Sequence, residues 1–242
     1  MILTIDIGNT KIKFGIFQDL NPIEIFNFDS TLNVNDKFKN IKKYKIHTII
    51  ISSVVPDITS IYQQYINNHF NIIPLIIKHT NCHVRLNVDK PDTVGADRIC
   101  NVAATLKLYD TPAIIIDFGT ATTFDIINKN QEFIGGTISP GVETSAHYLM
   151  KKANLLSTTN LTFPDNVIGK NTKTNLQSGI MFGAVDQVNG MIDRINKETN
   201  EDNKVILTGG FSKILAPHIN SNNILDMHLT LKGMIFIYES NK

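Results

Sequence analysis

Two acidic glycine turns carry the residues of this 242-residue chain that are best suited to chemistry. The first spans Asp6 to Thr10 (DIGNT), the second spans Asp117 to Ala121 (DFGTA), and each follows a run of β-forming apolar residues. A glycine in such a turn lets backbone N–H groups approach an anion closely, because it has no Cβ atom. The aspartate can hold a cation that bridges phosphate oxygens. Two such turns predict an enzyme that grips a nucleoside triphosphate from two sides.

The elements that must position these turns repeat along the chain. Each half begins with three strands, near 1–7, 11–18 and 22–28 and again near 112–118, 121–128 and 131–138. Helices and strands follow in each half, including helices at 95–109, 140–152, 172–198 and 230–240 and a strand at 72–77. The stretch 154–171 has little periodicity, which indicates an inserted loop. The sequence therefore predicts an α/β fold with two lobes, 1–111 and 112–242.

Composition argues against several classes of protein. With 42% hydrophobic residues and a net charge of +1, the chain is predicted to be globular, with no attraction for nucleic acid or anionic membranes. It shows no signal-peptide pattern and no apolar run long enough to cross a bilayer, so we expect a cytoplasmic protein. Cys82 and Cys100 are expected to be reduced thiols. His79, Cys82 and His83 are interpreted as an ordinary loop, because a structural zinc site needs a fourth ligand.

An ordered set of short motifs runs along the chain: Asp6–Thr10, Ser52–Pro56, Gly95–Arg98, Asp117–Ala121, Gly135–Gly141, Gly169–Thr172 and Thr208–Gly210. This set resembles the motifs of the type III pantothenate kinases of the actin/acetate-sugar-kinase superfamily. The resemblance implies duplicated ribonuclease-H-like (actin-like ATPase) lobes with an interlobe nucleotide cleft. It also implies ATP-dependent phosphorylation of the primary hydroxyl of pantothenate to 4'-phosphopantothenate, the first step of coenzyme A biosynthesis.

The motif Gly95-Ala96-Asp97-Arg98 is predicted to open a helix. The helix dipole explains an acid in the first turn, but it does not favour the adjacent arginine. Neighbouring helical residues do not face each other, so we expect little neutralisation between Asp97 and Arg98. Arg98 can bind a carboxylate in a bidentate fork, while Asp97 accepts the proton of a hydroxyl group. By resemblance, Asp97 is the general base and Gly95, Ala96, Asp97 and Arg98 line the pantothenate pocket.

The two turns are expected to share the nucleotide. The predicted ATP-binding residues are Asp6, Ile7, Gly8, Asn9, Thr10, Lys11, Ile12, Lys13 and Thr120. Lys11 and Lys13 can add positive charge, although their alternation along a strand favours solvent exposure. Mg²⁺ is expected with ATP, with Asp6 close to it, because phosphoryl transfer requires charge neutralisation. By resemblance, Asp117 holds a monovalent cation, either K⁺ or NH₄⁺.

Three further residues or motifs bear on the substrate and the assembly. Thr208-Gly209-Gly210 is predicted to leave room for adenine or ribose, or to be a plain strand–helix connection. The resemblance implies that Thr172 contacts pantothenate and that a homodimer completes the site. Val88 occupies a position where the family usually has a tyrosine in the pantothenate pocket. This departure puts substrate affinity in doubt, but not the reaction type.

Other functions remain open from the sequence. Another kinase of the superfamily, acting on a sugar or a small acid, is one alternative, although Asp97-Arg98 argues against it. A non-catalytic accessory factor for transcription is a second, disfavoured by the neutral charge and the absence of a helix-turn-helix signature. A chaperone-like ATPase is disfavoured because no peptide-binding domain follows the two predicted lobes.

Overall fold

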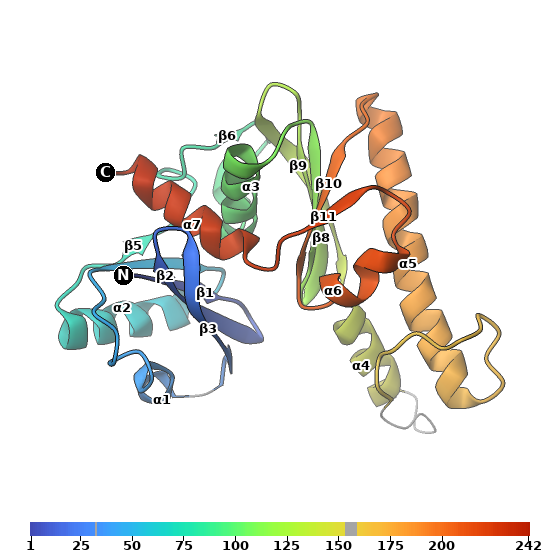
Figure 1. Ribbon diagram of the computed structural model, residues 1–242, viewed down its shortest axis with the longest axis horizontal. Coiled ribbons are helices and arrows are strands. Elements are labelled where there is room, and N and C mark those ends of the chain that lie inside the picture. Colours follow the sequence, from blue (N-terminus) through green and yellow to red (C-terminus); the bar gives the residue numbers. More distant parts are fainter. Residues whose placement is uncertain (32, 153–158) are drawn as a thin grey trace. The chain divides into compact units, whose positions relative to one another are not determined.

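The computed structural model describes residues 1–31, 33–152 and 159–242. The described chain forms two compact units: unit 1 contains Met1–Tyr109 and His228–Lys242, and unit 2 contains Asp110–Met227. Figure 1 shows the elements of both units along the chain. The elements of unit 1 are β1 (Ile2–Ile7), β2 (Lys11–Gln18), β3 (Asn21–Asp29), α1 (Val34–Phe38), β4 (Thr48–Ser53), α2 (Pro56–Phe70), β5 (Leu75–Ile76), β6 (Arg85–Leu86), η1 (Pro91–Thr93), α3 (Ala96–Leu108) and α7 (Leu229–Ser240). Those of unit 2 are β7 (Ala113–Phe118), β8 (Ala121–Ile127), β9 (Glu132–Pro140), α4 (Val142–Lys152), α5 (Thr172–Thr199), β10 (Lys204–Gly209), α6 (Ser212–Leu215), η2 (Ala216–His218) and β11 (Asn223–Leu225).

The two units share one strand order. In unit 1 the order is β3-β2-β1-β4-β5, with antiparallel pairing among the first three strands and parallel pairing from β1 onward. Unit 2 has the corresponding order β9-β8-β7-β10-β11, with the same change from antiparallel to parallel pairing at β7. The structure therefore confirms the predicted α/β fold with duplicated ribonuclease-H-like lobes.

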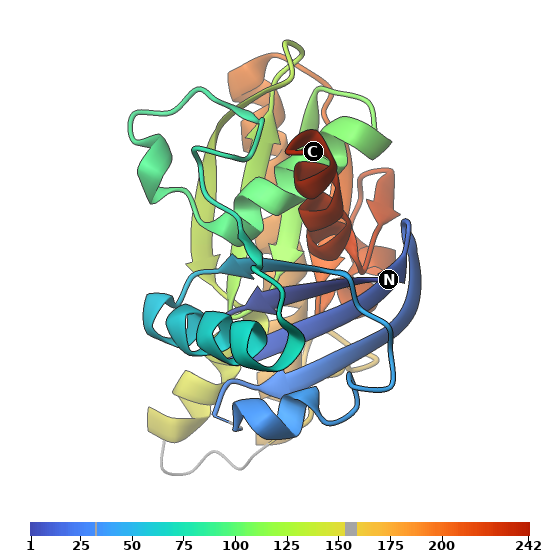
Figure 2. The ribbon, with the colours of Figure 1, turned by 90° about the vertical axis from the view of Figure 1, so that its left-hand side faces the viewer.

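Helices cover both faces of the sheet in unit 1. Alternate residues of β1, such as Leu3 and Ile5, pack with Phe38 of α1 and Tyr62 of α2. On the opposite face, residues such as Ile50 of β4 pack with α3 and α7. Figure 2 shows α7 lying beside α3. This arrangement follows from the buried, β-branched runs of the central strands, which have apolar side chains on both faces.

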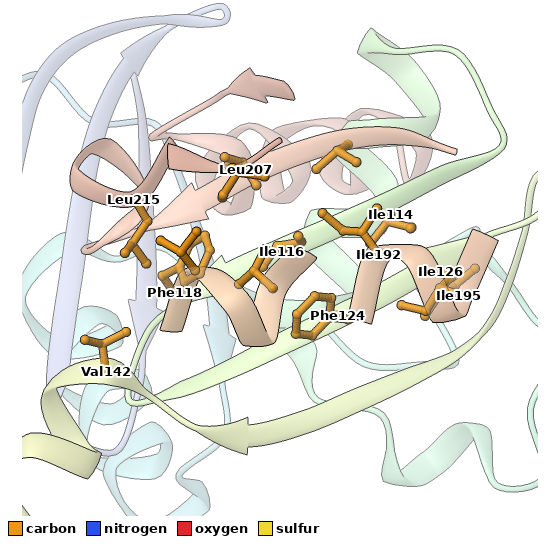
Figure 3. Close-up of a cluster of buried hydrophobic side chains, with 14 of the residues drawn as sticks. Ile114, Ile116, Phe118, Phe124, Ile126, Val142, Ile192, Ile195, Leu207 and Leu215 are labelled. Atoms are coloured by element: carbon orange, nitrogen blue, oxygen red, sulfur yellow. The ribbon is translucent and has the colours of Figure 1, made fainter. Parts of the chain in front are cut away.

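The core of unit 2 forms between its sheet and the long helix α5. Figure 3 shows Ile192 and Ile195 of α5 next to Ile114 and Ile116 of β7 and Ile126 of β8. The α5 positions recur at helical spacing and those of β7 at strand spacing, so each element presents one apolar face. This core fixes the strand ends at which the second glycine turn lies.

Three sequence expectations differ from the observed elements. The strand expected at 72–77 is reduced to Leu75–Ile76, because Pro74 has no N–H to donate to a ladder. The helix expected to begin at Pro140 begins at Val142, since Pro140 instead pairs with Ala121 as the last residue of β9. The C-terminal helix α7, assigned to the second lobe from the sequence, belongs to unit 1. Residues 159–171 of the expected loop contain no helix or strand, and 154–158 lie outside the described residues.

Candidate active site

The first glycine turn joins β1 and β2 in unit 1. The Gly8 N–H donates to the Lys11 carbonyl at 3.0 Å, which closes the turn. Ser30, the residue after β3, holds the turn: its N–H donates to the Thr10 carbonyl and its hydroxyl donates to the Asn9 carbonyl, both at 3.0 Å. Gly8 is half-buried, and Asn9 and Thr10 are exposed. The turn is thus held by hydrogen bonds to its carbonyl oxygens, while Asn9 and Thr10 remain exposed at the surface of the unit.

Asp6 precedes this turn and is held by the neighbouring parallel strand. In the β1–β4 ladder Asp6 lies opposite Ser52, and the Ser52 hydroxyl donates to Asp6 Oδ1 at 2.9 Å. Ser52 and Cys100 of α3 are both fully buried. The motif Ser52–Pro56 therefore supports the acidic end of the first turn.

The motif Gly95–Arg98 forms the start of α3. Gly95 is the N-cap residue, and the Arg98 N–H donates to Asp97 Oδ1 at 2.8 Å. A Cβ atom on Gly95 would lie 2.5 Å from Asp97 Oδ1 and 3.5 Å from Val54 Cγ1. A side chain at this position would therefore displace the carboxylate of Asp97. The motifs at 52–56 and 95–98 thus meet in unit 1.

The electrostatics of Asp97 reflect its position in the first turn of α3. Burial raises the pKa of Asp97, and the Arg98 N–H and guanidinium charge oppose that rise. The expectation that Arg98 does little to neutralise Asp97 is therefore wrong in part, since the helix start brings the charge close enough to act. Asp6 and Asp97 both lie near enough to Cys100 to contribute to a raised pKa of its thiol, although burial is the main cause. Unit 1 thus brings the two predicted functional carboxylates around one buried thiol.

The second glycine turn, in unit 2, is one residue shorter than the first. The Gly119 N–H donates to the Ala121 carbonyl at 3.0 Å between β7 and β8. The start of α4 packs on this turn: the Gly141 N–H donates to the Thr120 carbonyl at 3.0 Å, and the Thr144 hydroxyl donates to the same oxygen at 2.7 Å. A Cβ atom on Gly141 would lie only 2.2 Å from the Gly119 carbonyl oxygen. The glycine of the Pro140-Gly141 pair is therefore required for this contact.

The motif Thr208-Gly209-Gly210 lies beside Asp117. Thr208 pairs with Asp117 across the parallel strands β10 and β7. Gly209 has a positive φ of 89°, and a Cβ atom on it would lie 2.4 Å from Asp117 Oδ1 and 2.5 Å from the Phe118 nitrogen. Gly209 therefore leaves room for the Asp117 carboxylate. This close approach is enough to explain a glycine at position 209, so the residue does not by itself indicate a site for adenine or ribose.

Thr172 is the first residue of α5 and is exposed. Asn171 caps the helix, and its side chain accepts from the Thr174 N–H at 3.0 Å in a capping box. A Cβ atom on Gly169 would lie 2.5 Å from the Asn175 nitrogen. Helix initiation thus explains Gly169 and Asn171, and it leaves Thr172 at the surface.

The other predicted site residues lie in unit 1. Lys11 is exposed and Lys13 half-buried on β2, while Ile7 and Ile12 are core residues on either side of the turn. Val88 is half-buried in the segment between β6 and η1. Ala96 is buried against the core beneath α3.

Sequence reasoning missed the roles of Ser52 and Thr144 in supporting the two turns. A signal existed for Ser52, because it ends a buried strand that runs parallel to β1. Parallel strands end at the same edge of a sheet, which places Ser52 beside Asp6. No comparable pattern indicated Thr144.

Asp6 and Asp117 are the candidate metal-binding residues of the two turns. Among residues 1–31, 33–152 and 159–242, no group of three or more His, Cys, Asp or Glu side chains is suited to hold a metal ion. Mg²⁺ needs only one or two carboxylates when nucleotide phosphates and water supply its other ligands. The half-buried Asp6 and Asp117, each next to a glycine turn, fit such a role. The Cys82 thiol donates to the His79 carbonyl at 3.2 Å, as part of the loop.

Solved structures share this fold. A protein of Campylobacter jejuni described as a Baf family transcriptional activator is 24% identical, with a TM-score of 0.64 over 99% of this chain and 98% of that one. A protein of Listeria monocytogenes described as an N-acetylmannosamine kinase is 12% identical, with a TM-score of 0.54 over 100% of this chain and 99% of that one. The strand order and these likenesses place the chain in the fold class of actin-like ATPases and sugar kinases.

Sequence similarity then defines the family within this class. The family model described as type III pantothenate kinase matches residues 2–194. Proteins with this same description from Sulfurihydrogenibium sp. and Halalkalibacterium halodurans are 37% and 36% identical, and the alignments cover 98% and 100% of this chain and 99% and 100% of those proteins. The chain belongs to the type III pantothenate kinase family.

Proposed function

We propose that this protein transfers the γ-phosphoryl group of ATP to the primary hydroxyl of pantothenate, giving 4'-phosphopantothenate and ADP in the first step of coenzyme A biosynthesis. One observation carries the proposal beyond family membership. Unit 1 holds Asp97 at the start of α3 and Asp6 at the first turn, both within electrostatic reach of Cys100. The proposed base for the hydroxyl and the carboxylate proposed to hold Mg²⁺ thus occupy the same unit.

In the proposed reaction Asp97 orients the attacking hydroxyl and accepts its proton. The transition state of phosphoryl transfer is loose, so positioning and charge neutralisation contribute more than base strength. Gly95 supports this role because it leaves room for the Asp97 carboxylate. Arg98, the next residue, binds the carboxylate at the other end of pantothenate in a bidentate fork.

The nucleotide is proposed to contact both glycine turns. Gly8, Asn9 and Thr10 supply donors to phosphate oxygens from the first turn, and Thr120 does so from the second. Asp6 would hold the Mg²⁺ that accompanies ATP, and the bound ion would supply neutralisation of the charge that develops on the phosphates. Asp117 would hold a monovalent cation, K⁺ or NH₄⁺.

We also propose that the protein is a homodimer through α5, with Thr172 contacting pantothenate. A groove of about 230 Å³ lies between α5 and the segment from β9 to α4, and Leu149, Ile180 and Gly183 line it. Cβ atoms on Gly179 or Gly183 would have no neighbour within 4 Å. Tyr148 and Leu149 of α4 are exposed nearby. This apolar and open surface supports the packing of a second copy.

The direct test measures ADP formation from ATP with pantothenate present or omitted, in potassium and again in sodium buffer. We expect pantothenate-dependent turnover that requires both Mg²⁺ and potassium. A panel of sugars and small acids serves as the comparison for the alternative kinases. Turnover with a panel member and none with pantothenate would reject the proposed substrate, and no ATP turnover with any acceptor would favour a regulatory role.

A further inference from the structure

We propose that Lys37 is a positioning residue for nucleotide binding: its buried amino group holds Ser30, and Ser30 in turn holds the first glycine turn in the shape that binds phosphate. This inference rests on the proposed binding of ATP by that turn. It assigns to the turn a side chain that is expected to touch neither substrate, and it accounts for a lysine in the core of unit 1.

The burial of Lys37 is the first observation. Lys37 lies on the short helix α1 and is only 1% exposed, although a lysine is almost never fully buried unless its amino group has partners. Lys39, two residues further on, is exposed and pairs with Asp36 at 2.6 Å. Burial costs a lysine its hydration and its side-chain entropy. The contacts of the amino group must therefore explain its position.

Two contacts fix the amino group of Lys37. Its Nζ donates to the Ser30 carbonyl at 3.3 Å. It also lies 5.7 Å from the centroid of the Tyr62 ring of α2, which is within the range of a cation–π contact. The Tyr62 ring packs edge-on against Phe14 of β2, with 6.1 Å between centroids. The amino group is thus held between the core and the residue that follows β3.

Ser30 carries this restraint to the turn. Its N–H donates to the Thr10 carbonyl and its hydroxyl donates to the Asn9 carbonyl, both at 3.0 Å. Because the two carbonyls accept from one residue, a shift of Ser30 moves the backbone of the turn. Three hydrogen bonds therefore make a continuous path from Lys37 to the residues proposed to bind phosphate.

Lys37 acts on the turn through position more than through charge. Burial lowers the pKa of Lys37, and the charge of Asp29 opposes this fall. Asp29 is the last residue of β3 and precedes Ser30. A carboxylate near the amino group offsets the field that a lone cation would exert on bound phosphates. The hydrogen bond to the Ser30 carbonyl is what remains to act on the turn.

The path is tested with Lys37→Met, which keeps an extended side chain but has no donor. We measure kcat, both KM values and, by calorimetry, the affinity for a non-hydrolysable ATP analogue. We expect the KM for ATP to rise and the analogue affinity to fall about fivefold, the size of one net hydrogen bond. The kcat and the KM for pantothenate are expected to stay unchanged, because neither depends on the shape of this turn in the proposed site.

Amide hydrogen exchange measures the restraint in the absence of any ligand. The Ser30 N–H donates into the turn, and the Gly8 N–H closes the turn on the Lys11 carbonyl at 3.0 Å. We expect both amides to exchange faster in Lys37→Met, while the amides of β4 are unchanged.

Two controls separate positioning from a loss of stability. Lys39→Met removes an exposed lysine next to the same helix and should leave every measurement unchanged. Ile66→Val trims the core that also contains Tyr62. It should lower the melting temperature, with no change in analogue affinity and no selective effect on the Ser30 and Gly8 amides.

A double-mutant cycle tests the route through Ser30. Ser30→Ala removes the hydroxyl bond to the Asn9 carbonyl and leaves the backbone of residue 30 in place. If Lys37 acts through Ser30, Lys37→Met lowers analogue affinity less in a Ser30→Ala background than it does alone.

The outcomes are distinct. Unchanged analogue affinity in Lys37→Met, or unchanged exchange of the Ser30 and Gly8 amides, would overturn the inference, as would effects of the two substitutions that simply multiply. If Lys37→Met does not fold, Lys37→Gln, with a shorter neutral side chain, makes the same test. If the unaltered protein binds the analogue but does not phosphorylate pantothenate, the proposed substrate fails, while calorimetry and amide exchange still test Lys37.

Discussion

At the residue scale, the chemistry proposed for this protein concentrates on Asp97. Its carboxylate is confined by Gly95, bonded to the Arg98 N–H and partly removed from solvent. Burial raises its pKa, and Arg98 limits the rise. The same residue is thus made a better proton acceptor while its position is fixed.

The first prediction concerns this carboxylate. Asp97→Asn should lower kcat by about 10²-fold or more, because it removes the proton acceptor, while ATP binding measured by calorimetry is retained. Only ionised Asp97 accepts a proton. Because burial raises its pKa, activity should be lost on acidification at a higher pH than for an ordinary aspartate, which titrates at about 3.9. The pH profile of kcat/KM measures this limb. Turnover near that of the unaltered protein in Asp97→Asn would remove Asp97 from the mechanism.

The second prediction concerns Val88. This half-buried residue stands where the family resemblance implies a tyrosine in the pantothenate pocket. Val88→Tyr should lower the KM for pantothenate and leave the KM for ATP unchanged, because a ring and a hydroxyl add contact area and a hydrogen-bonding group. Steady-state kinetics with each substrate varied in turn provide the measurement. An unchanged KM for pantothenate would mean that another residue lines this part of the pantothenate pocket.

At the element scale, close backbone contacts hold the supporting helices in place. The contact between Gly233 of α7 and Cys100 of α3 is the closest of these, and a nearby hydrogen bond from the Thr230 hydroxyl to Asn101 Oδ1, at 2.8 Å, joins the same two helices. Because α3 begins with Asp97, the C-terminal helix supports the proposed base. The duplicated strand order places a glycine turn in each unit, and the contact between α3 and α7 fixes the helix that carries Asp97.

The third prediction tests the α3–α7 contact. Gly233→Ala should destabilise the protein by about 1–3 kcal/mol, because the methyl group would overlap backbone atoms that cannot rotate away. Gly190→Ala is the matched control, since a Cβ atom there meets nothing within 4 Å and alanine favours a helix. Thermal and urea unfolding of both variants measure the difference. Equal stability of Gly233→Ala and the unaltered protein would show that the helices can separate without cost.

At the scale of the whole molecule, the chain consists of two units with one strand order, each with an acidic glycine turn at the corresponding place. The C-terminal segment His228–Lys242 returns to unit 1. None of the helices in the described part of the chain has the length and apolar character needed to span a membrane. The long helix α5 presents glycines to open space, which is the feature behind the proposed dimer.

The fourth prediction tests that assembly. Gly183→Lys should halve the molar mass measured by light scattering, because it places a charge in the apolar groove against α4. The fold should persist, since a Cβ atom at this position has no neighbour within 4 Å. Gln63→Lys puts the same charge on an exposed position of α2 and should leave the mass unchanged. A dimer that survives Gly183→Lys would exclude this face as the interface.

The sequence by itself determined the two glycine turns, the strand–helix order, the start of α3 at the motif Gly95–Arg98 and the family resemblance. These depend on periodicity and on glycine conformation, which act between residues close in the chain. Tertiary structure alone decided the bond from Ser52 to Asp6, the burial of Cys100, the contact of Gly209 with Asp117 and the return of α7 to unit 1. Each of these depends on strand register or helix packing between residues far apart in the chain, and no local pattern encodes that geometry.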